Sequence, residues 1–135
     1  MAKNRTIVLI AMMVFATAFL QFLALAQGSG AAKATSEPTE GLCVYYNDKF
    51  QGHALASGEK YDKNALTAAH RTFPFGTKVK VTNLKNNKSV VVRVNDRGPH
   101  NSKLRIIEVT RRAAEELDMI RDGKTKVQIA VVKSD

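Results

Sequence analysis

The clearest pattern in this chain is alternation between apolar and polar residues in two neighbouring segments, 77–83 and 88–95. Successive side chains of a strand point to opposite faces, so the valines of each segment are predicted to line the interior. Asn86 and Asn87 lie between the two segments, and asparagine tolerates the positive φ that tight hairpin turns need. The pattern therefore predicts an antiparallel hairpin.

Shorter apolar runs predict further elements. A helix is expected over 111–120, where apolar residues recur on one face, with Thr110 as its cap and Gly123 as its end. Residues 48–64 are polar and glycine-containing, and they predict a long loop of the kind that is often functional. Other strands are expected at 42–47, 104–109 and 126–132, and a short apolar stretch lies at 67–70. Many short strands with one helix predict a mainly β fold, a small barrel.

The first 26 residues differ in character from the rest. A short basic head precedes an apolar run that ends at residues 24–26, Ala-Leu-Ala, a small-x-small cleavage pattern. This layout predicts a secretory signal peptide over 1–26, and the run is also long enough to anchor the chain in a membrane if it is not cleaved. Residues 27–40 have little apolar content and predict a flexible linker, so the globular domain is expected over 41–133.

Composition narrows the partners and cofactors. The formal net charge of +9 suits an anionic partner, and for an exported protein a cell-wall polymer or membrane surface fits better than nucleic acid, although spread charges also suit an ordinary solvated surface. Cys43 is the only cysteine, so no internal disulfide is expected and the residue is predicted to be buried. His53, His70 and His100 lack metal-ligand spacing, and we expect neither a metal nor another cofactor.

Asp96 ends the second valine-rich segment and shares the parity of its valines. That parity predicts Asp96 at the rim of the core-facing side, a position that suits a general acid. Gly98 and Pro99 follow at once, so Asp96 also has the position of a turn-initiating residue, and local sequence alone favours the turn. Arg97 has the opposite parity and is expected to point away from Asp96.

Five short motifs follow one another along the domain. They are Gly58-Glu59-Lys60-Tyr61-Asp62, Thr67-Ala68-Ala69-His70, Phe75-Gly76-Thr77, Val79-Lys80-Val81-Thr82-Asn83-Leu84 and Val92-Arg93-Val94-Asn95-Asp96-Arg97-Gly98-Pro99. Together they resemble the RlpA (rare lipoprotein A) family over about residues 41–132, and several motifs in order are more specific than any one. The resemblance implies a six-stranded double-psi β-barrel that acts on peptidoglycan as a lytic transglycosylase, on glycan strands stripped of peptides.

The resemblance also implies catalytic residues. The matching positions are Glu59, His70 and Asp96. Asp96 is the expected acid and base, and Glu59 is expected as a partner carboxylate or substrate binder. His70 either orients an acid or binds sugar, or it is a hydrogen-bonded structural residue that closes a loop.

Two motifs depart from the family pattern. Tyr45-Tyr46-Asn47 stands where the family usually has Trp-Tyr-Gly, and Ile107-Glu108-Val109-Thr110 stands where it usually has Ile-Asp-Leu-Ser. Glu108 keeps the negative charge with a longer reach, which makes it a further catalytic candidate. Substrate contacts are expected from Tyr46, Tyr61 and Arg97. Core packing is the alternative for the tyrosines.

Two functions remain open at this point. In an endolytic lytic transglycosylase, carboxyl groups move protons while the C6 hydroxyl of muramic acid attacks its own anomeric carbon, leaving 1,6-anhydro ends. The alternative is a non-catalytic, expansin-like module that binds or loosens wall polysaccharide. In either case peptidoglycan strands are the expected partner of a monomer that works in the periplasm or at the cell wall.

Overall fold

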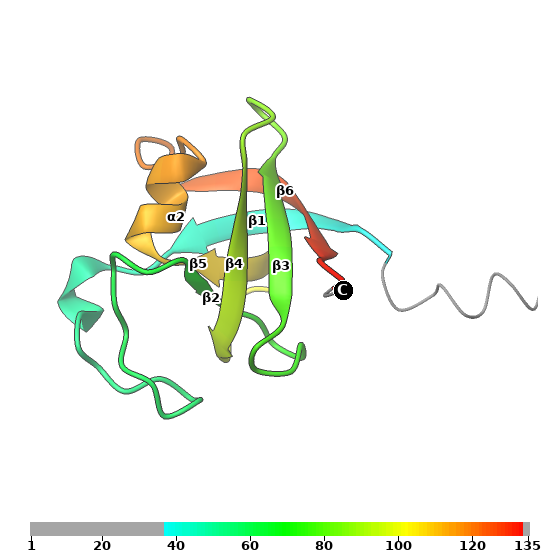
Figure 1. Cartoon of the computed structure of the whole chain (residues 1–135). Helices are drawn as coiled ribbons and strands as arrows, with labels where there is room; N and C mark the ends of the chain where they lie inside the picture. The colour runs from blue at the N-terminus through cyan, green and yellow to red at the C-terminus, as the bar shows by residue number, and fades with distance from the viewer. Residues whose placement is uncertain (1–36, 134–135) are drawn as a thin grey trace, which may run out of the picture. The chain divides into compact units, whose positions relative to one another are not determined.

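The computed structural model describes residues 37–133, which build a closed barrel of six strands (Figure 1). The strands are β1 (Thr39–Tyr45), β2 (Thr67–Ala69), β3 (Lys78–Asn83), β4 (Ser89–Asp96), β5 (Arg105–Val109) and β6 (Lys124–Val131). They close in the order β1-β5-β2-β4-β3-β6. The connections carry a 3-10 turn, η2 (Asp48–Phe50), and a short helix, α2 (Arg111–Glu116). The predicted mainly β barrel with a short helix is therefore confirmed.

Strand pairing in the barrel is mixed. β3 and β4 form the predicted antiparallel hairpin, and Asn87 in its turn has a φ of 64°. By contrast, β1 runs parallel to β5, and β2 runs parallel to β4. Parallel neighbours need long crossover connections. Here β2 lies between β4 and β5, and β5 lies between β1 and β2, so each of them separates two strands that are consecutive in the sequence. This topology brings the end of β4 next to β2 and β5, where the candidate site lies.

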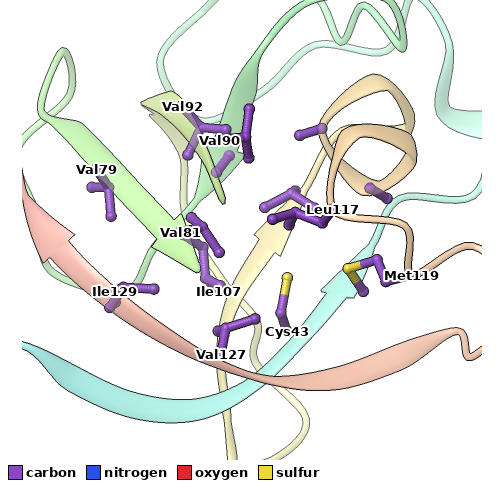
Figure 2. Packing of buried hydrophobic residues seen from close by; sticks show 14 of the residues in the cluster. Cys43, Val79, Val81, Val90, Val92, Ile107, Leu117, Met119, Val127 and Ile129 are labelled. Atoms are coloured by element: carbon purple, nitrogen blue, oxygen red, sulfur yellow. The ribbon is translucent and has the colours of Figure 1, made fainter. Parts of the chain in front are cut away.

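The alternating valines of β3 and β4 line the main core, as their pattern predicts. Each is at most 6% exposed, and the set is Val79, Val81, Val90, Val92 and Val94. Figure 2 shows this cluster continuing to Cys43 on β1, Ile107 on β5, and Leu117 beyond α2. Cys43 is a free thiol and fully buried, as predicted, and burial raises its pKa above the ordinary range.

A buried amide, Asn83 at the end of β3, ties the segment after α2 to the barrel. Its Nδ2 donates to the Leu117 carbonyl at 2.9 Å. Its Oδ1 accepts from the Thr125 hydroxyl and from the Lys85 backbone N–H, both at 3.0 Å. Because both ends of the amide are satisfied, its complete burial leaves no polar atom unpaired.

Helix α2 ends earlier than the predicted segment 111–120. Asp118 adopts a left-handed φ of 54°. The N–H groups of Asp118 and Met119 donate to the carbonyls of Glu115 at 3.0 Å and Ala114 at 3.1 Å, which are the two bonds of a Schellman motif. Glycine usually supplies this conformation, and here an aspartate does so several residues before Gly123.

The ends of other elements also differ from the prediction. β1 begins at Thr39, so strand pairing starts within the segment 27–40 that the sequence predicts as a linker. β6 begins at Lys124 rather than at residue 126. The predicted signal peptide, 1–26, lies outside the described residues. Between residues 37 and 133, no helix has the length and apolar character needed to cross a membrane.

Candidate active site

The register of β4 shifts just before its end, and this shift places Asp96. One pair across β2 and β4 joins Ala68 to Val94, and the next joins Ala69 to Asp96, which leaves Asn95 as an extra residue on β4. An inserted residue turns the following side chain to the other face of the sheet. Ala68 belongs to the main core, whereas Ala69 belongs to a second, small cluster. The prediction that Asp96 shares the face of the valines is therefore wrong, because the bulge turns it outward.

Glu108 lies on the same outer face as Asp96. Ala69 of β2 pairs with Asp96 on one side and with Glu108 of β5 on the other. Neighbouring strands lie about 4.8 Å apart, so the Cα atoms of the two acids are about 10 Å apart. Ile107 and Val109 are buried in the main core, and Glu108 between them therefore faces outward.

A pocket of about 390 Å³ opens at this face, and both Asp96 and Glu108 line it. The other lining residues are Tyr46, Phe50, His53, Ala54, Leu55, Arg97 and His100. Partly apolar walls with a few convergent polar groups are typical of ligand-binding clefts. We therefore take this pocket as the candidate active site.

Both oxygens of the Asp96 carboxyl group accept hydrogen bonds. The Tyr46 hydroxyl donates to Oδ2 at 2.5 Å, and the Ala56 backbone N–H donates to Oδ1 at 2.8 Å. Tyr46 directly follows β1, and Ala56 belongs to the long loop between β1 and β2. Hydrogen bonds to a charged acceptor are stronger than those between neutral groups, so these two donors fix the orientation of the carboxyl group.

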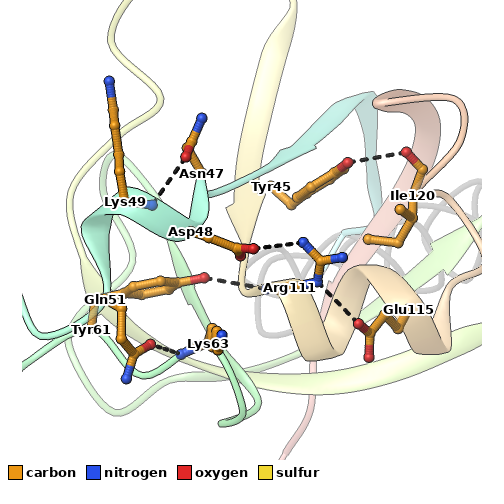
Figure 3. A network of polar contacts seen from close by, with 10 residues as sticks. All are labelled: Tyr45, Asn47, Asp48, Lys49, Gln51, Tyr61, Lys63, Arg111, Glu115 and Ile120. Atoms are coloured by element: carbon orange, nitrogen blue, oxygen red, sulfur yellow. Dashed lines mark hydrogen bonds and ion pairs between the residues drawn. The ribbon is translucent and has the colours of Figure 1, made fainter.

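Tyr46 and Tyr61 pack together behind Asp96. Their ring centroids are 4.5 Å apart, and their exposed fractions are 7% and 1%. Burial and the hydrogen bond to Asp96 raise the pKa of Tyr46, so its hydroxyl remains a donor. The Tyr61 hydroxyl accepts the backbone N–H of Arg111 at 3.3 Å, at the start of α2 (Figure 3). Tyr46 thus reaches the pocket, while Tyr61 packs inside the protein.

Glu108 combines partial burial with a like-charged neighbour. Burial raises its pKa, and the nearby Asp96 raises it further, while Arg105 and His100 act in the opposite sense. A half-buried acid beside a second acid keeps its proton to a higher pH than an exposed glutamate does. This is the property that a general acid needs.

Glu59 does not line this pocket. Its carboxylate forms a two-bond ion pair with the Arg93 guanidinium on β4, and both N···O distances are 2.8 Å. Both side chains are exposed by about two fifths. Its hydrogen bonds to Arg93 lower the pKa of Glu59, so it is ionised at neutral pH. The structure therefore brings Asp96 and Glu108 together and leaves Glu59 in a separate ion pair.

His70 is held in the turn that follows β2. Its Nδ1 accepts the backbone N–H groups of Thr72 and Phe73, both at 3.1 Å, and its ring stacks on the Phe73 ring at 3.7 Å between centroids. Burial and the nearby Arg97 lower the pKa of His70. Its backbone N–H donates to the Asp96 carbonyl at 3.2 Å. These contacts are those of the structural alternative, and they support Asp96 through the backbone.

Arg97 lines the pocket, but its guanidinium is held by the neighbouring turn. It donates to the carbonyls of His70 at 3.1 Å and Phe73 at 2.8 Å, and it lies over the Phe75 ring at 4.1 Å. The guanidinium is therefore bound by backbone carbonyls of this turn, and its contact with substrate stays a prediction.

Five lining residues are not predicted from the sequence as site residues: Phe50, His53, Ala54, Leu55 and His100. Phe50 belongs to η2 and packs edge-on against Tyr46 and His53, with centroid distances of 6.4 and 5.7 Å. His53 and His100 lie in loops. No periodicity marks a face in such segments, and the only usable signal is an aromatic residue, Phe50, inside a polar loop.

Two carboxyl groups in one pocket can perform acid–base chemistry, because one can donate a proton while the other accepts one. Among the residues that the structure describes, no three histidine, cysteine, aspartate or glutamate side chains form a group that could hold a metal ion.

A family model described as lytic transglycolase matches residues 39–129. This chain belongs to that family. The Treponema pallidum "probable endolytic peptidoglycan transglycosylase RlpA" is 53% identical over 90 residues, which are 67% of this chain and 28% of that protein. The Campylobacter jejuni "endolytic peptidoglycan transglycosylase RlpA" is 46% identical over 99 residues, 73% of this chain and 36% of that protein. The lytic transglycolase domain described here thus spans about a third of the length of these curated relatives.

Solved structures share the lytic transglycolase fold at low sequence identity. A Clavibacter michiganensis expansin superposes with a TM-score of 0.58 at 19% identity, over 73% of this chain and 52% of that chain. The Streptomyces papain inhibitor superposes with a TM-score of 0.56 at 22% identity, over 72% of this chain and 96% of that chain. The double-psi β-barrel is therefore the shared feature.

Proposed function

We propose that this protein cleaves the glycan backbone of peptidoglycan as an endolytic lytic transglycosylase. The matched RlpA proteins are named for this activity. The observation that carries the proposal here is the placement of two acids, Asp96 and Glu108, on one face of a single pocket.

The reaction needs one proton donor and one proton acceptor. The C6 hydroxyl of the muramic residue attacks its own anomeric carbon, and the bond from that carbon to the glycosidic oxygen breaks. The donor protonates the leaving oxygen, and the acceptor takes the proton of the C6 hydroxyl. The product ends in a 1,6-anhydro ring, and a proton returns from acceptor to donor through water before the next cycle.

The surroundings of the two acids suggest how they divide this work. Glu108 has a raised pKa, so it is the carboxyl group suited to donate a proton. Asp96 accepts hydrogen bonds at both oxygens from Tyr46 and Ala56, so its carboxylate is oriented as an acceptor. We therefore assign Glu108 as the acid and Asp96 as the base.

The pocket walls also suit a sugar. Phe50 is 38% exposed, and an exposed aromatic ring offers a flat apolar surface to the face of a pyranose. Leu55, which is partly buried, also lines the pocket. Arg97 and His100 also line this pocket. Peptidoglycan lies outside the cytoplasmic membrane, so the proposal requires export, which the predicted signal peptide over 1–26 would direct.

The test is digestion of purified, peptide-free glycan strands with the purified protein, followed by mass spectrometry of the products. Asp96→Asn and Glu108→Gln are the matched variants, because each removes a titratable oxygen and keeps the side-chain shape. We expect anhydromuramic ends from the wild type, with at least a hundredfold lower rate for either variant. Circular dichroism spectra of both variants should match the wild type, which separates loss of chemistry from loss of folding.

Other products would overturn the proposal in different ways. Reducing ends in place of anhydro ends would identify a hydrolase that activates water. Strands that bind to the wild type but stay intact would favour the non-catalytic, expansin-like module.

A further inference from the structure

The loop between β1 and β2 carries a small hairpin, residues 53–61, which we call the tip loop. Its two arms pair through Ala54 and Lys60, and the Leu55 N–H donates to the Glu59 carbonyl at 2.7 Å. Gly58, with a φ of 91°, completes the turn at its end. In Figure 1 this hairpin projects from the barrel beyond η2.

The base of the tip loop is held by contacts that do not involve its turn. The Gly52 N–H donates to the Tyr61 carbonyl at 2.9 Å, and the Lys63 N–H donates to the Gln51 side chain at 2.8 Å. An ion pair of 2.8 Å also joins Asp48 to Arg111 on α2 (Figure 3). The base is therefore fixed to the helix side of the barrel.

The turn of the tip loop meets β4 through two polar contacts. The Ala56 N–H donates to Asp96 Oδ1, and the Glu59 carboxylate pairs with Arg93 through two bonds. Arg93 and Asp96 lie three positions apart on the same strand. One contact involves a backbone donor of the candidate active site, and the other is a charge pair outside the pocket.

We propose that Glu59 is a positioning residue whose ion pair with Arg93 holds the tip loop against β4, so that the Ala56 N–H stays on Asp96. This inference rests on the proposed function, in which the Asp96 carboxylate accepts a proton during the reaction. It assigns to Glu59 a role other than proton transfer. It also assigns Arg93 to the same positioning role.

The geometry of the pair suits positioning more than stability. Exposed ion pairs contribute little to the free energy of unfolding, because water and salt screen them. A guanidinium that meets a carboxylate through two parallel bonds nevertheless fixes their relative orientation. Loss of the pair should therefore loosen the turn and leave the barrel folded. The lowered pKa of Glu59 also makes it a poor proton donor at neutral pH.

The experiment compares Glu59→Gln, Arg93→Gln and the double variant in two measurements. The first is kcat and KM on peptide-free glycan strands. The second is hydrogen exchange of the Ala56 amide, followed by NMR. We expect each single variant to lower kcat by about fivefold, equivalent to about 1 kcal/mol, and to speed exchange at Ala56 by a similar factor. The double variant should be no worse than either single variant, because the two residues act as one unit.

Two further variants make the test sharper. The charge-reversed pair, Glu59→Arg with Arg93→Glu, should recover part of the lost kcat and slow the exchange again. Lys85→Gln is the matched control, because it breaks an exposed ion pair of 3.0 Å with Asp122 that lies away from the pocket. It should leave kcat and the exchange of Ala56 at wild-type values.

The opposite pattern would overturn the inference. If Glu59 transfers protons, Glu59→Gln should cost a hundredfold or more, while Arg93→Gln keeps wild-type kcat and wild-type exchange at Ala56. If the wild type cleaves no glycan, the proposed function fails, and the exchange measurement alone then decides whether the ion pair holds the turn.

Discussion

Tyr46→Phe removes a single oxygen atom from the candidate active site and leaves the packing in place. The ring of residue 46 keeps its contact with Tyr61 at 4.5 Å. What disappears is the 2.5 Å hydrogen bond to Asp96 Oδ2, one of the two that orient this carboxyl group. The variant therefore tests whether orientation of Asp96 matters for turnover.

The expected effect on stability follows from the kind of bond that is lost. A hydrogen bond to a charged acceptor contributes about 1.5–3 kcal/mol. Asp96 is only partly buried, so water can replace the missing donor and the lower figure applies. We expect the free energy of unfolding to fall by about 1.5 kcal/mol, which lowers Tm by roughly 6–10 °C for a domain of this size. Turnover should fall further, by about tenfold or more in kcat, because a carboxylate that can rotate is seldom aligned with the substrate proton that it has to accept.

Tyr45→Phe is the matched control. Its hydroxyl donates to the Ile120 carbonyl at 3.0 Å, and the residue does not line the pocket. It should lose about 1 kcal/mol of stability and keep its kcat. Thermal unfolding and digestion of peptide-free glycan give both quantities for each variant. A Tyr46→Phe protein with wild-type kcat would refute the view that this hydroxyl orients a reacting group.

Three further predictions concern acid–base behaviour and stability. Burial and the nearby Asp96 raise the pKa of Glu108 in the folded protein above its value in the unfolded chain. The wild type should therefore lose stability as pH rises from the unfolded-state pKa to the folded-state pKa of this group. Urea unfolding at a series of pH values should show this loss, and Glu108→Gln should lack it. Asn83→Ala should cost about 3 kcal/mol in urea unfolding, because its buried partners lose their hydrogen bonds. Asn86→Ala removes one part-buried bond to the Leu117 carbonyl and one exposed bond from the Lys88 N–H, and it should cost only about 1 kcal/mol; equal losses would contradict this account. Asp118→Gly should raise the free energy of unfolding by about 0.5–1 kcal/mol, since glycine adopts its positive φ without strain, and a lower Tm would count against the assigned helix end.

The strands of this barrel are predictable because alternating apolar and polar residues mark which side of each strand faces the core. The valines of β3 and β4 alternate with polar residues, and the structure buries them as expected. The end of α2 is harder to predict from the sequence, because Asp118 takes a conformation that glycine usually adopts. Local composition favours Gly123 as the end and gives no sign of the earlier one.

The candidate site is predictable only in part. Asp96 continues the parity of Val90, Val92 and Val94 in the sequence, yet it faces the other way. The cause is the register between β2 and β4, which depends on pairing with a segment more than twenty residues away. Glu59 shows the same limit, since its partner Arg93 is set by how the long loop folds back on β4.

Strand β1 forms its ladders with β5 and β6, the last two strands of the chain. β5 begins 60 residues and β6 79 residues after β1 ends, so no fragment that lacks the last strand can close the barrel. Chains dominated by such distant contacts fold slowly, on the millisecond-to-second scale. The order of strands in this barrel thus delays its closure until the last strand is available. If the predicted leader directs export of the unfolded chain, translocation can finish before the barrel closes.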